Sequence, residues 1–496
     1  MSNQTPIVQQ SISRRGIIVI MLILIGLYGV YFVLGDITGT DTAREVAIFG
    51  AIILLTVLIM RQPVIGLSVI VSTVLFQNLF FDFDLSENLF TVMGVITGIS
   101  YIVSKRNQPL LQRIAHPGVF FALAFIIWGT VTHTDVALMG TRSWLLTYIQ
   151  LFGGVVLAAE LLIPERQRWF MVIFVMACVP SAIAAFNEAE IVGVLSRQLV
   201  RGAGFQGNQN ALAFYLCIAI VFTMWLHFKN PNRRQHVVYF VLYAIFILGV
   251  VGTVSRAGFL MLVMTLILPP ILFRWASPPP ENRTYAQQQE RRQRRERQLV
   301  LLFIVAAILL TLFIPDAYWD YLYNNLFAVR EWDSGVERRF DLVELAARTW
   351  QNNLISGVGF GEFINVSARA LGGTYTAHNL YLVTLAETGT IGFVLFIGML
   401  LSATYSFYQV AKRRDGVYST QAAMWLSIMM LVFLRGPTAS TLHYDKLLWM
   451  LVGVGAAMAP RWLIVTPPKL TFIFPRKRRT QPLTPLATPL ENPTVL

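Results

Sequence analysis

The chain has 496 residues, of which 55% are hydrophobic and only 13% are charged. Its mean hydropathy of +0.60 is far above what a soluble globular domain can bury. This composition excludes a protein whose main solvent is water, and the recurring long apolar runs predict an all-α polytopic membrane protein. The two cysteines both lie inside apolar runs, so neither a disulfide framework nor a thiolate metal site is expected.

The formal net charge of +13 raises the question of nucleic-acid binding. The basic residues, however, form short clusters between apolar runs and do not make one basic face with interleaved aromatic side chains. Such clusters are typical of cytoplasmic loops that orient membrane helices by the positive-inside rule. We therefore expect the lipid bilayer, and no nucleic acid, as a partner.

Apolar runs and their punctuation predict a bundle of about 12–14 transmembrane helices. The candidate spans cover residues 16–34, 45–60, 64–80, 88–104, 118–132, 143–162, 169–187, 210–228, 237–252, 257–273, 299–314, 379–408, 419–435 and 447–463. A cytoplasmic N-terminus puts every basic cluster on the cytoplasmic side. Both termini are then expected inside the cell.

The predicted organisation has seven parts. In chain order they are N-terminal transmembrane helices (1–200), a transmembrane core with arginine motifs (201–274), a cytoplasmic Arg-rich loop (275–298), one transmembrane helix (299–314), a large folded external loop (315–378), C-terminal transmembrane helices (379–463) and a cytoplasmic Pro-rich tail (464–496). The external loop contains aromatic residues, an amphipathic helical pattern around Phe340–Trp350 and the glycine run GVGFG. No strand precedes Gly357 and Gly359 of that run, so we interpret it as a tight turn and not as a nucleotide-binding loop.

Charged residues are few on the predicted external side, and two arginines there lie close to helix starts. Arg201 opens the segment RGAGFQGNQNALA, where a flexible glycine-rich approach would let backbone amides and the guanidinium reach one anion. Arg256, in GTVSRAG, falls in a turn too short to be a soluble loop. Because a charge stranded in lipid costs at least ~2.5 kcal/mol, this arginine either binds a ligand or extends to the interface, and both interpretations stay open.

Arg339 and His378 lie at the two ends of a second external segment. Histidine is the side chain most easily poised as a base near neutral pH, although a histidine at a helix start also serves as a cap or hydrogen-bond anchor. Three arginines on the same face offer bidentate clamps for phosphate oxygens beside a candidate base. This combination favours transfer chemistry on a phosphate-bearing donor.

Glu387 lies about 13 Å beyond His378 along an ideal helix and toward its opposite side. We therefore expect its carboxylate to pair with a buried polar group, with proton coupling in a transporter as the alternative. No H-E-x-x-H, paired-cysteine or G-x-S-x-G pattern occurs, so metal hydrolysis and serine-esterase chemistry have no support. No metal or other cofactor is predicted.

Four segments together resemble the O-antigen ligase and O-antigen polymerase superfamily of bacterial cell-surface polysaccharide assembly. They are RGAGFQGNQNALA, which contains Asn210; TVSRAG; RFDLVELAARTWQNNLISGVGFGEF; and TAHNLYLVTLAETGTIGF, which contains Asn379 and Glu387. The resemblance covers about the second half of the chain, from Arg201 to Phe393. It departs from the simplest family pattern at Gln209, where a proline is common, and in its span count, which exceeds the twelve or so expected of the family.

The resemblance implies a metal-independent membrane glycosyltransferase in the bacterial inner membrane, with its active site facing outside. The implied donor is a glycan linked to a polyprenyl diphosphate such as undecaprenyl diphosphate, and the implied acceptor is a glycan, the lipid A core of lipopolysaccharide or a protein. His378 would orient or deprotonate the acceptor hydroxyl. The implied diphosphate-binding residues are Arg201, Arg256 and Arg339, the last two being catalytic as well, and the implied supporting residues are Asn210, Gly357, Gly359, Asn379 and Glu387.

Within this family the acceptor separates a ligase, which we slightly favour, from a polymerase that joins lipid-linked repeats. A membrane transporter of sugars or anions would also use many helices and intramembrane charges. The large external loop and the lack of an obvious inverted repeat argue against a transporter. A scaffold that recruits partners through the Arg-rich loop and the C-terminal tail is a third possibility.

Overall fold

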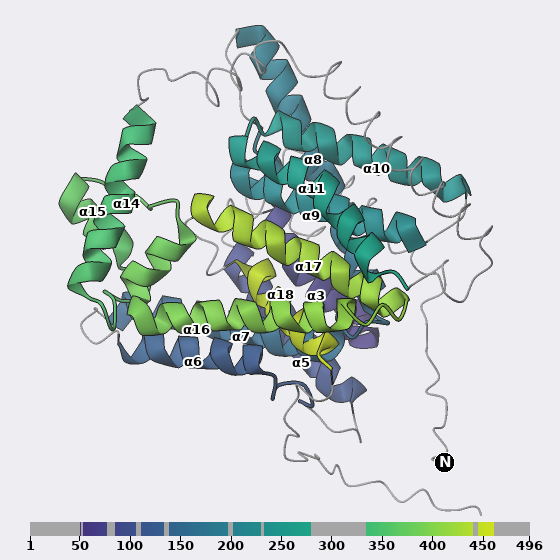
Figure 1. Ribbon diagram of the computed structural model, residues 1–496, viewed down its shortest axis with the longest axis horizontal. Coiled ribbons are helices and arrows are strands. Elements are labelled where there is room, and N and C mark those ends of the chain that lie inside the picture. The colour runs from purple at the N-terminus through teal and green to yellow at the C-terminus, as the bar shows by residue number, and fades with distance from the viewer. Residues whose placement is uncertain are drawn as a thin grey trace, which may run out of the picture.

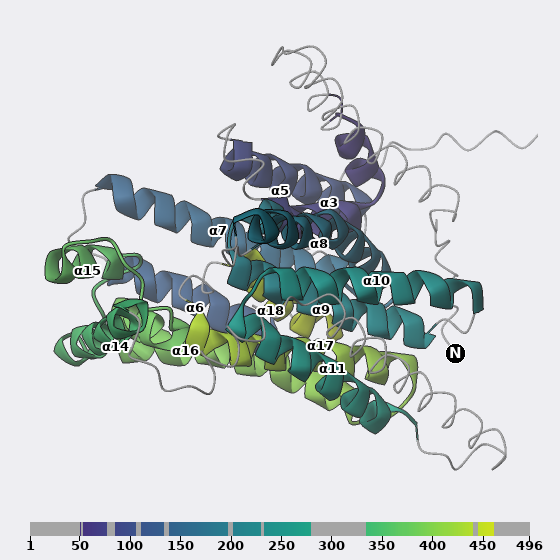
Figure 2. The same ribbon diagram turned by 90° about the horizontal axis from the view of Figure 1, so that it is seen from above.

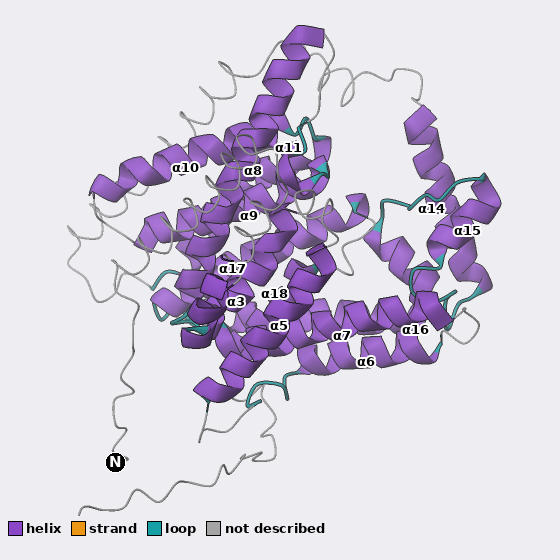
Figure 3. Cartoon of the chain, turned by 180° about the vertical axis from the view of Figure 1, so that it is seen from behind, coloured by secondary structure: helices purple, strands orange, loops and turns teal. Residues whose placement is uncertain are grey.

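The computed structural model describes residues 50, 53–76, 85–105, 111–132, 138–196, 202–229, 233–278, 334–439 and 445–460. These residues form helices joined by loops and contain no strand (Figure 3), which confirms the all-α fold class. The α-helices are α3 (Pro63–Ser72), α5 (Leu85–Ser104), α6 (Pro117–Val131), α7 (Leu138–Leu161), α8 (Gln167–Ser196), α9 (Gln209–Lys229), α10 (Arg233–Gly252), α11 (Arg256–Ala276), α14 (Ser334–Asn352), α15 (Phe363–Leu371), α16 (Leu380–Ala411), α17 (Val417–Arg435) and α18 (Lys446–Met458). Short 3₁₀ turns are η1 (Thr73–Phe76), η2 (Gly204–Gln206) and η4 (Gly436–Thr438).

Six described helices are long and apolar enough to cross a membrane. They cover Gln167–Glu188, Gln209–Lys229, Gln235–Gly252, Arg256–Trp275, Leu380–Ala411 and Val417–Thr438, and shorter apolar helices cover Pro63–Leu75, Thr91–Ser104, Pro117–Val131, Leu145–Leu161 and Lys446–Met458. Each coincides with a span predicted from the sequence, so the chain is a multi-pass membrane protein. The predicted spans 16–34 and 299–314 lie outside the described residues, as do most of the Arg-rich loop and the tail beyond residue 460.

Helix α9 is the central helix of the bundle. Its apolar window is 94% buried, and it packs against α8, α10, α11 and α17. A helix that is apolar on every side is stable only when other helices surround it or lipid covers it. Here the other helices cover it, and the faces left exposed belong to the surrounding helices, such as α10 and α11.

Glycines let α18 approach its two neighbours closely. A Cβ at Gly453 would lie 2.3 Å from the carbonyl oxygen of Val155 in α7, and a Cβ at Gly455 would lie 2.7 Å from the Cα of Ala403 in α16. Small residues at helix contacts increase van der Waals packing, which drives helix association in lipid, where the hydrophobic effect does not act. The backbone of α18 is thereby fixed between α7 and α16.

Helices α14 and α15 stand at one side of the bundle (Figures 1 and 2) and pack on α16. The predicted amphipathic helix around Phe340–Trp350 is confirmed, and it buries Leu342 and Ala346 against a small cluster that includes Phe363. Phe340 itself points outward, with 56% of its surface exposed. The segment is therefore a docked, folded unit with its own small core.

Phe360 anchors the glycine-rich turn to the bundle. Its ring centroid lies 4.3 Å from that of Tyr148 and 5.2 Å from that of Phe125. It also occupies the space beside Gly129 in α6, where a Cβ would overlap the ring. The turn that follows α14 is thus held by an aromatic side chain inserted between α6 and α7.

Candidate functional site

The site lies at the end of the bundle where α9, α11 and α18 begin and α17 ends, and we call this the site end. A chain of direct contacts brings these helix ends together: Asn210 of α9 contacts Ser255, Tyr215 of α9 contacts Asp445 before α18, and Asp445 contacts Arg435 at the end of α17. The start of α16 joins them through Tyr381, whose hydroxyl donates to the carbonyl oxygen of Phe433 at 3.1 Å.

Arg256 is the first residue of α11. The preceding Ser255 caps the helix, because its hydroxyl accepts a hydrogen bond from the Gly258 amide at 2.9 Å. The same hydroxyl donates to the side-chain oxygen of Asn210 at 2.7 Å. Only three residues separate α10 from α11, which agrees with a turn too short to be a soluble loop. Asn210 therefore fixes the helix start that carries Arg256, whose side chain is half-buried.

The glycine-rich approach to α9 corrects one expectation. The amides of Ala203 and Gly204 donate to the carboxylate of Glu188 at 2.7 and 3.1 Å, and the Gly202 amide donates to Gly252 at 2.9 Å. Gly204 has a φ of +52°, and a Cβ there would lie 2.5 Å from a carbonyl oxygen of α8. These amides hold the segment against α8 and α10 and are not free to bind an anion together with Arg201, which lies outside the described residues.

His378 stands two residues before α16, in the left-handed region with a φ of +43°. Non-glycine residues rarely adopt this conformation, and such residues cluster at functional sites. Asn379 caps the helix, since its side-chain oxygen accepts from the amides of Tyr381 and Leu382 at 3.1 and 3.2 Å. The cap therefore belongs to Asn379, which leaves the exposed imidazole of His378 available for another role.

Arg339, near the start of α14, acts electrostatically on His378. Partial desolvation by the surrounding protein, followed by the positive charge of Arg339, lowers the pKa of His378 below its usual value. Both causes disfavour the imidazolium, so the neutral ring, which can accept a proton, persists to lower pH. The neighbouring Arg338 lies over the ring of Tyr375, with its guanidinium carbon 4.9 Å from the centroid, and so helps to dock α14.

The GVGFG turn packs against a break in α16. Gly389 has a φ of +66° inside that helix, and Gly357 has a φ of +69° in the turn. The amides of Val358 and Gly359 donate to the carbonyl oxygens of Ala386 and Glu387 at 2.9 and 2.8 Å. Backbone groups that the break releases from the helix are thus satisfied by the turn.

The carboxylate of Glu387 adds further hydrogen bonds to the contact between the GVGFG turn and α16. It is 3% exposed and accepts hydrogen bonds from the backbone amides of Gly361 and Phe363, at the start of α15. A carboxylate at a helix N-terminus is favourable because it meets unpaired amides and the positive end of the helix dipole. Glu387, Gly357 and Gly359 therefore fix the turn between α14 and α15.

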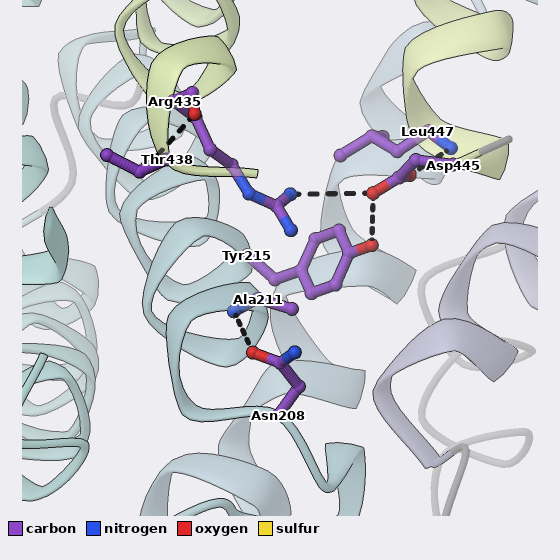
Figure 4. Close-up of polar contacts among 7 residues, drawn as sticks. All are labelled: Asn208, Ala211, Tyr215, Arg435, Thr438, Asp445 and Leu447. Carbon is purple, nitrogen blue, oxygen red and sulfur yellow. Dashed lines mark hydrogen bonds and ion pairs between the residues drawn. The ribbon is translucent and has the colours of Figure 1, made fainter. Parts of the chain in front are cut away.

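Three residues at the site end were not identified from the sequence. Tyr215 donates to Asp445 at 2.6 Å, and Arg435 forms an ion pair with the same oxygen at 3.4 Å (Figure 4). Asp445 also caps α18 through the Leu447 amide at 2.9 Å. An aspartate directly before an apolar run is a helix-start signal, and Arg435 is one of few arginines on its side, so both were detectable as single residues. Their pairing was not, because Tyr215 and Asp445 are far apart in the chain.

Within the described residues, no group of three or more His, Cys, Asp or Glu side chains is arranged to hold a metal ion. The candidate site instead consists of arginines, a histidine and asparagines at helix starts.

A protein-family model described as O-Antigen ligase matches residues 241–397. The match includes Arg256, Arg339 and His378, and it also includes the turn and the break in α16. The family resemblance found in the motifs is thereby confirmed for this segment. A search of curated proteins found no match to the chain.

Proposed function

We propose that this chain is a membrane glycosyltransferase that moves a glycan from a polyprenyl-diphosphate donor to an acceptor hydroxyl in polysaccharide assembly. The match of residues 241–397 to the O-antigen ligase family supports this proposal. The reaction takes place at the site end, which faces away from the cytoplasm. The protein lies in the bacterial inner membrane with both termini inside. We favour a ligase, for which the acceptor is the lipid A core. A lipid-linked repeat as acceptor would make the protein a polymerase.

The observation that carries the proposal is the placement of His378, which has a φ of +43° directly before the Asn379 cap of α16 and lies within electrostatic range of Arg339. A base for the acceptor hydroxyl must be neutral at working pH, and the lowered pKa of His378 keeps it neutral. The guanidinium of Arg339 that contributes to this shift is also a fork suited to phosphate oxygens. Desolvation and the charge of Arg339 together favour the neutral form of the base, and the same guanidinium attracts the anionic leaving group.

The proposed step is a direct displacement. The acceptor oxygen forms a bond to the anomeric carbon while the bond from that carbon to the diphosphate oxygen breaks. The acceptor proton passes to His378, and the polyprenyl diphosphate leaves with the bonding electrons. Arg256 and Arg339, together with Arg201, stabilise the charge that builds on the diphosphate, without a metal ion.

The supporting residues act through the backbone. Asn210 holds the helix start before Arg256, and Asn379 holds the helix start after His378. Glu387 holds the turn that joins α14 to α15. A displacement needs its groups within a few tenths of an ångström of the reactive geometry, which rigid helix ends can provide.

Transfer can be tested with the purified full-length protein in proteoliposomes. Lipid-linked glycan extracted from the producing cells is the donor, and the released polyprenyl diphosphate is counted in the presence of a chelator. We expect release that depends on added acceptor and persists with the chelator. Counterflow of radiolabelled sugar without any release would instead identify a transporter.

Arg339→Lys separates a bidentate clamp from a simple positive charge. An ammonium lacks the planar fork, so we expect release to fall by at least about tenfold. Arg348→Lys is the matched control, because Arg348 lies on the same helix with a 69% exposed side chain paired to Glu344. Full activity of the Arg339 variant would remove that residue from the clamp.

A further inference from the structure

Tyr215, Arg435 and Asp445 form a buried polar cluster at the site end, which we call the bridging cluster (Figure 4). Arg435 and Asp445 each expose 7% of their side chains. The guanidinium carbon of Arg435 also lies 4.3 Å from the ring centroid of Phe214. The cation is therefore held by a carboxylate on one side and by an aromatic face on the other.

Stability alone is a poor explanation for this cluster. Removing two charges from water costs several kcal/mol per ion, and well-packed apolar residues often serve as well or better. The pair is also loose, because Arg435 and Asp445 are 3.4 Å apart. In some proteins a buried ion pair instead selects one arrangement of the surrounding elements. The question is which arrangement this cluster selects.

On one side the cluster reaches the helix start that carries Arg256. Tyr215 belongs to α9, the helix that also carries Asn210. Asn210 accepts the hydrogen bond from the Ser255 cap of α11 at 2.7 Å. Close packing reinforces this link, since a Cβ at Gly258 of α11 would lie 2.6 Å from the Cβ of Ala213 in α9.

On the other side the cluster reaches the helix start that follows His378. Gly436 comes directly after Arg435, and a Cβ there would lie 2.5 Å from the ring of Tyr381. The Tyr381 hydroxyl donates to the carbonyl oxygen of Phe433 in the last turn of α17. Tyr381 is in the first turn of α16, three residues after His378.

We propose that Tyr215, Arg435 and Asp445 are positioning residues that fix the separation between His378 and Arg256. This inference rests on the proposed function, and none of the three residues is placed on the substrate. They join α9 and α17 to the start of α18. The start of α16, which follows His378, and the start of α11, which carries Arg256, therefore cannot move independently. Loss of the cluster should impair the chemical step more than donor binding.

The mildest test is Tyr215→Phe, which removes one hydroxyl and leaves the ring. Its control is Tyr101→Phe, because Tyr101 also donates to a buried carboxylate, that of Glu160, at 3.0 Å. That contact lies at the opposite end of the bundle, where Glu160 also accepts from the Arg113 amide and Arg113 donates to Ala457 near the end of α18. Both variants therefore lose a hydrogen bond from tyrosine to a carboxylate, at opposite ends of the bundle. Tyr101→Phe also loses the hydrogen bond that its hydroxyl accepts from the Leu111 amide at 3.3 Å.

Steady-state release of polyprenyl diphosphate is measured in proteoliposomes for both variants. A shift of about 1 Å in a reacting group costs on the order of 100-fold in rate. For a smaller shift, Tyr215→Phe should lower kcat by about tenfold or more and leave KM for the lipid-linked donor within about twofold. Tyr101→Phe should keep kcat. Equal kcat values for the two variants, at equal thermal stability, would overturn the proposal.

A distance measurement supplies a readout independent of activity. Spin labels at Arg348→Cys on α14 and Leu260→Cys on α11 report the two halves, since both positions are exposed and the native Cys178 and Cys217 are buried. The distance distribution should broaden with Tyr215→Phe and stay narrow with Tyr101→Phe. An unchanged distribution would overturn the proposal even where Tyr215→Phe lowers kcat.

Further variants separate this inference from the proposed function. Asp445→Asn should repeat the Tyr215→Phe result. Arg435→Lys should retain part of the wild-type rate, because lysine keeps the positive charge. If the wild-type protein releases no polyprenyl diphosphate, the proposed function fails. If it does so, and the Tyr215, Asp445 and Tyr101 variants behave alike, only the positioning role fails.

Discussion

The break in α16 predicts that Gly389→Ala will be strongly destabilising. Gly389 has a φ of +66° and a ψ of −172°, a conformation adopted almost only by glycine, and placing another residue there costs about 1–3 kcal/mol. The new Cβ would lie 2.1 Å from the carbonyl oxygen of Ile355, so the turn must move. Movement weakens the hydrogen bond from the Thr390 amide to Leu354, which is 2.8 Å long and worth about 0.5–1.5 kcal/mol.

Together these effects should lower the free energy of unfolding by about 1.5–4.5 kcal/mol. The matched control is Gly98→Ala in α5, where a Cβ meets no atom within 4 Å and the glycine has no positive φ. Alanine in an ordinary helical position gains up to about 1 kcal/mol over glycine. The two substitutions add the same methyl group and should therefore act in opposite directions.

Thermal unfolding of both variants can be followed in the same detergent at one heating rate, because membrane proteins often unfold irreversibly. We expect a clear fall in the apparent Tm for Gly389→Ala and no fall for Gly98→Ala. Transfer activity of the Gly389 variant should fall as well, since the displaced turn carries α14 and Arg339. A Gly389→Ala protein as stable and active as wild type would refute the packing described between the GVGFG turn and the break in α16.

Two further predictions concern the base and the anchor. Arg339→Gln removes a positive charge that lowers the pKa of His378, so the acidic limb of the pH profile of the residual transfer rate should move to higher pH. The control Arg348→Gln should leave that limb in place. An acidic limb unchanged by both substitutions would disprove the electrostatic effect of Arg339 on His378. Phe360→Ala should cost about 3–5 kcal/mol of stability, because it empties the space between α6 and α7; a Tm within error of wild type would show that the turn is not anchored there.

The fold was largely predictable because lipid imposes a simple rule on sequence. A helix that crosses hydrocarbon must be apolar over most of its length, and the runs that satisfy this rule coincide with the described helices. The close spacing of α10 and α11 at Arg256 followed from the same reading. The amphipathic helix α14 was visible from the positions of its apolar residues.

The site was only partly predictable, because its joints depend on contacts between distant segments. The break at Gly389 reads as an ordinary helical glycine until the turn at Gly357 is seen against it. The hydrogen bond between Tyr215 and Asp445 joins residues 230 positions apart, and no local pattern encodes it. The amides of Ala203 and Gly204, which the glycine pattern predicted to bind an anion, donate hydrogen bonds to the carboxylate of Glu188 instead.

The central claim is that His378 is the base for transfer, and its most direct test is His378→Ala in the proteoliposome assay. Donor binding is measured alongside turnover with labelled lipid-linked glycan, so that loss of chemistry is distinguished from loss of the clamp. We predict that release of polyprenyl diphosphate is abolished while donor binding persists. Unchanged turnover in His378→Ala would contradict the account.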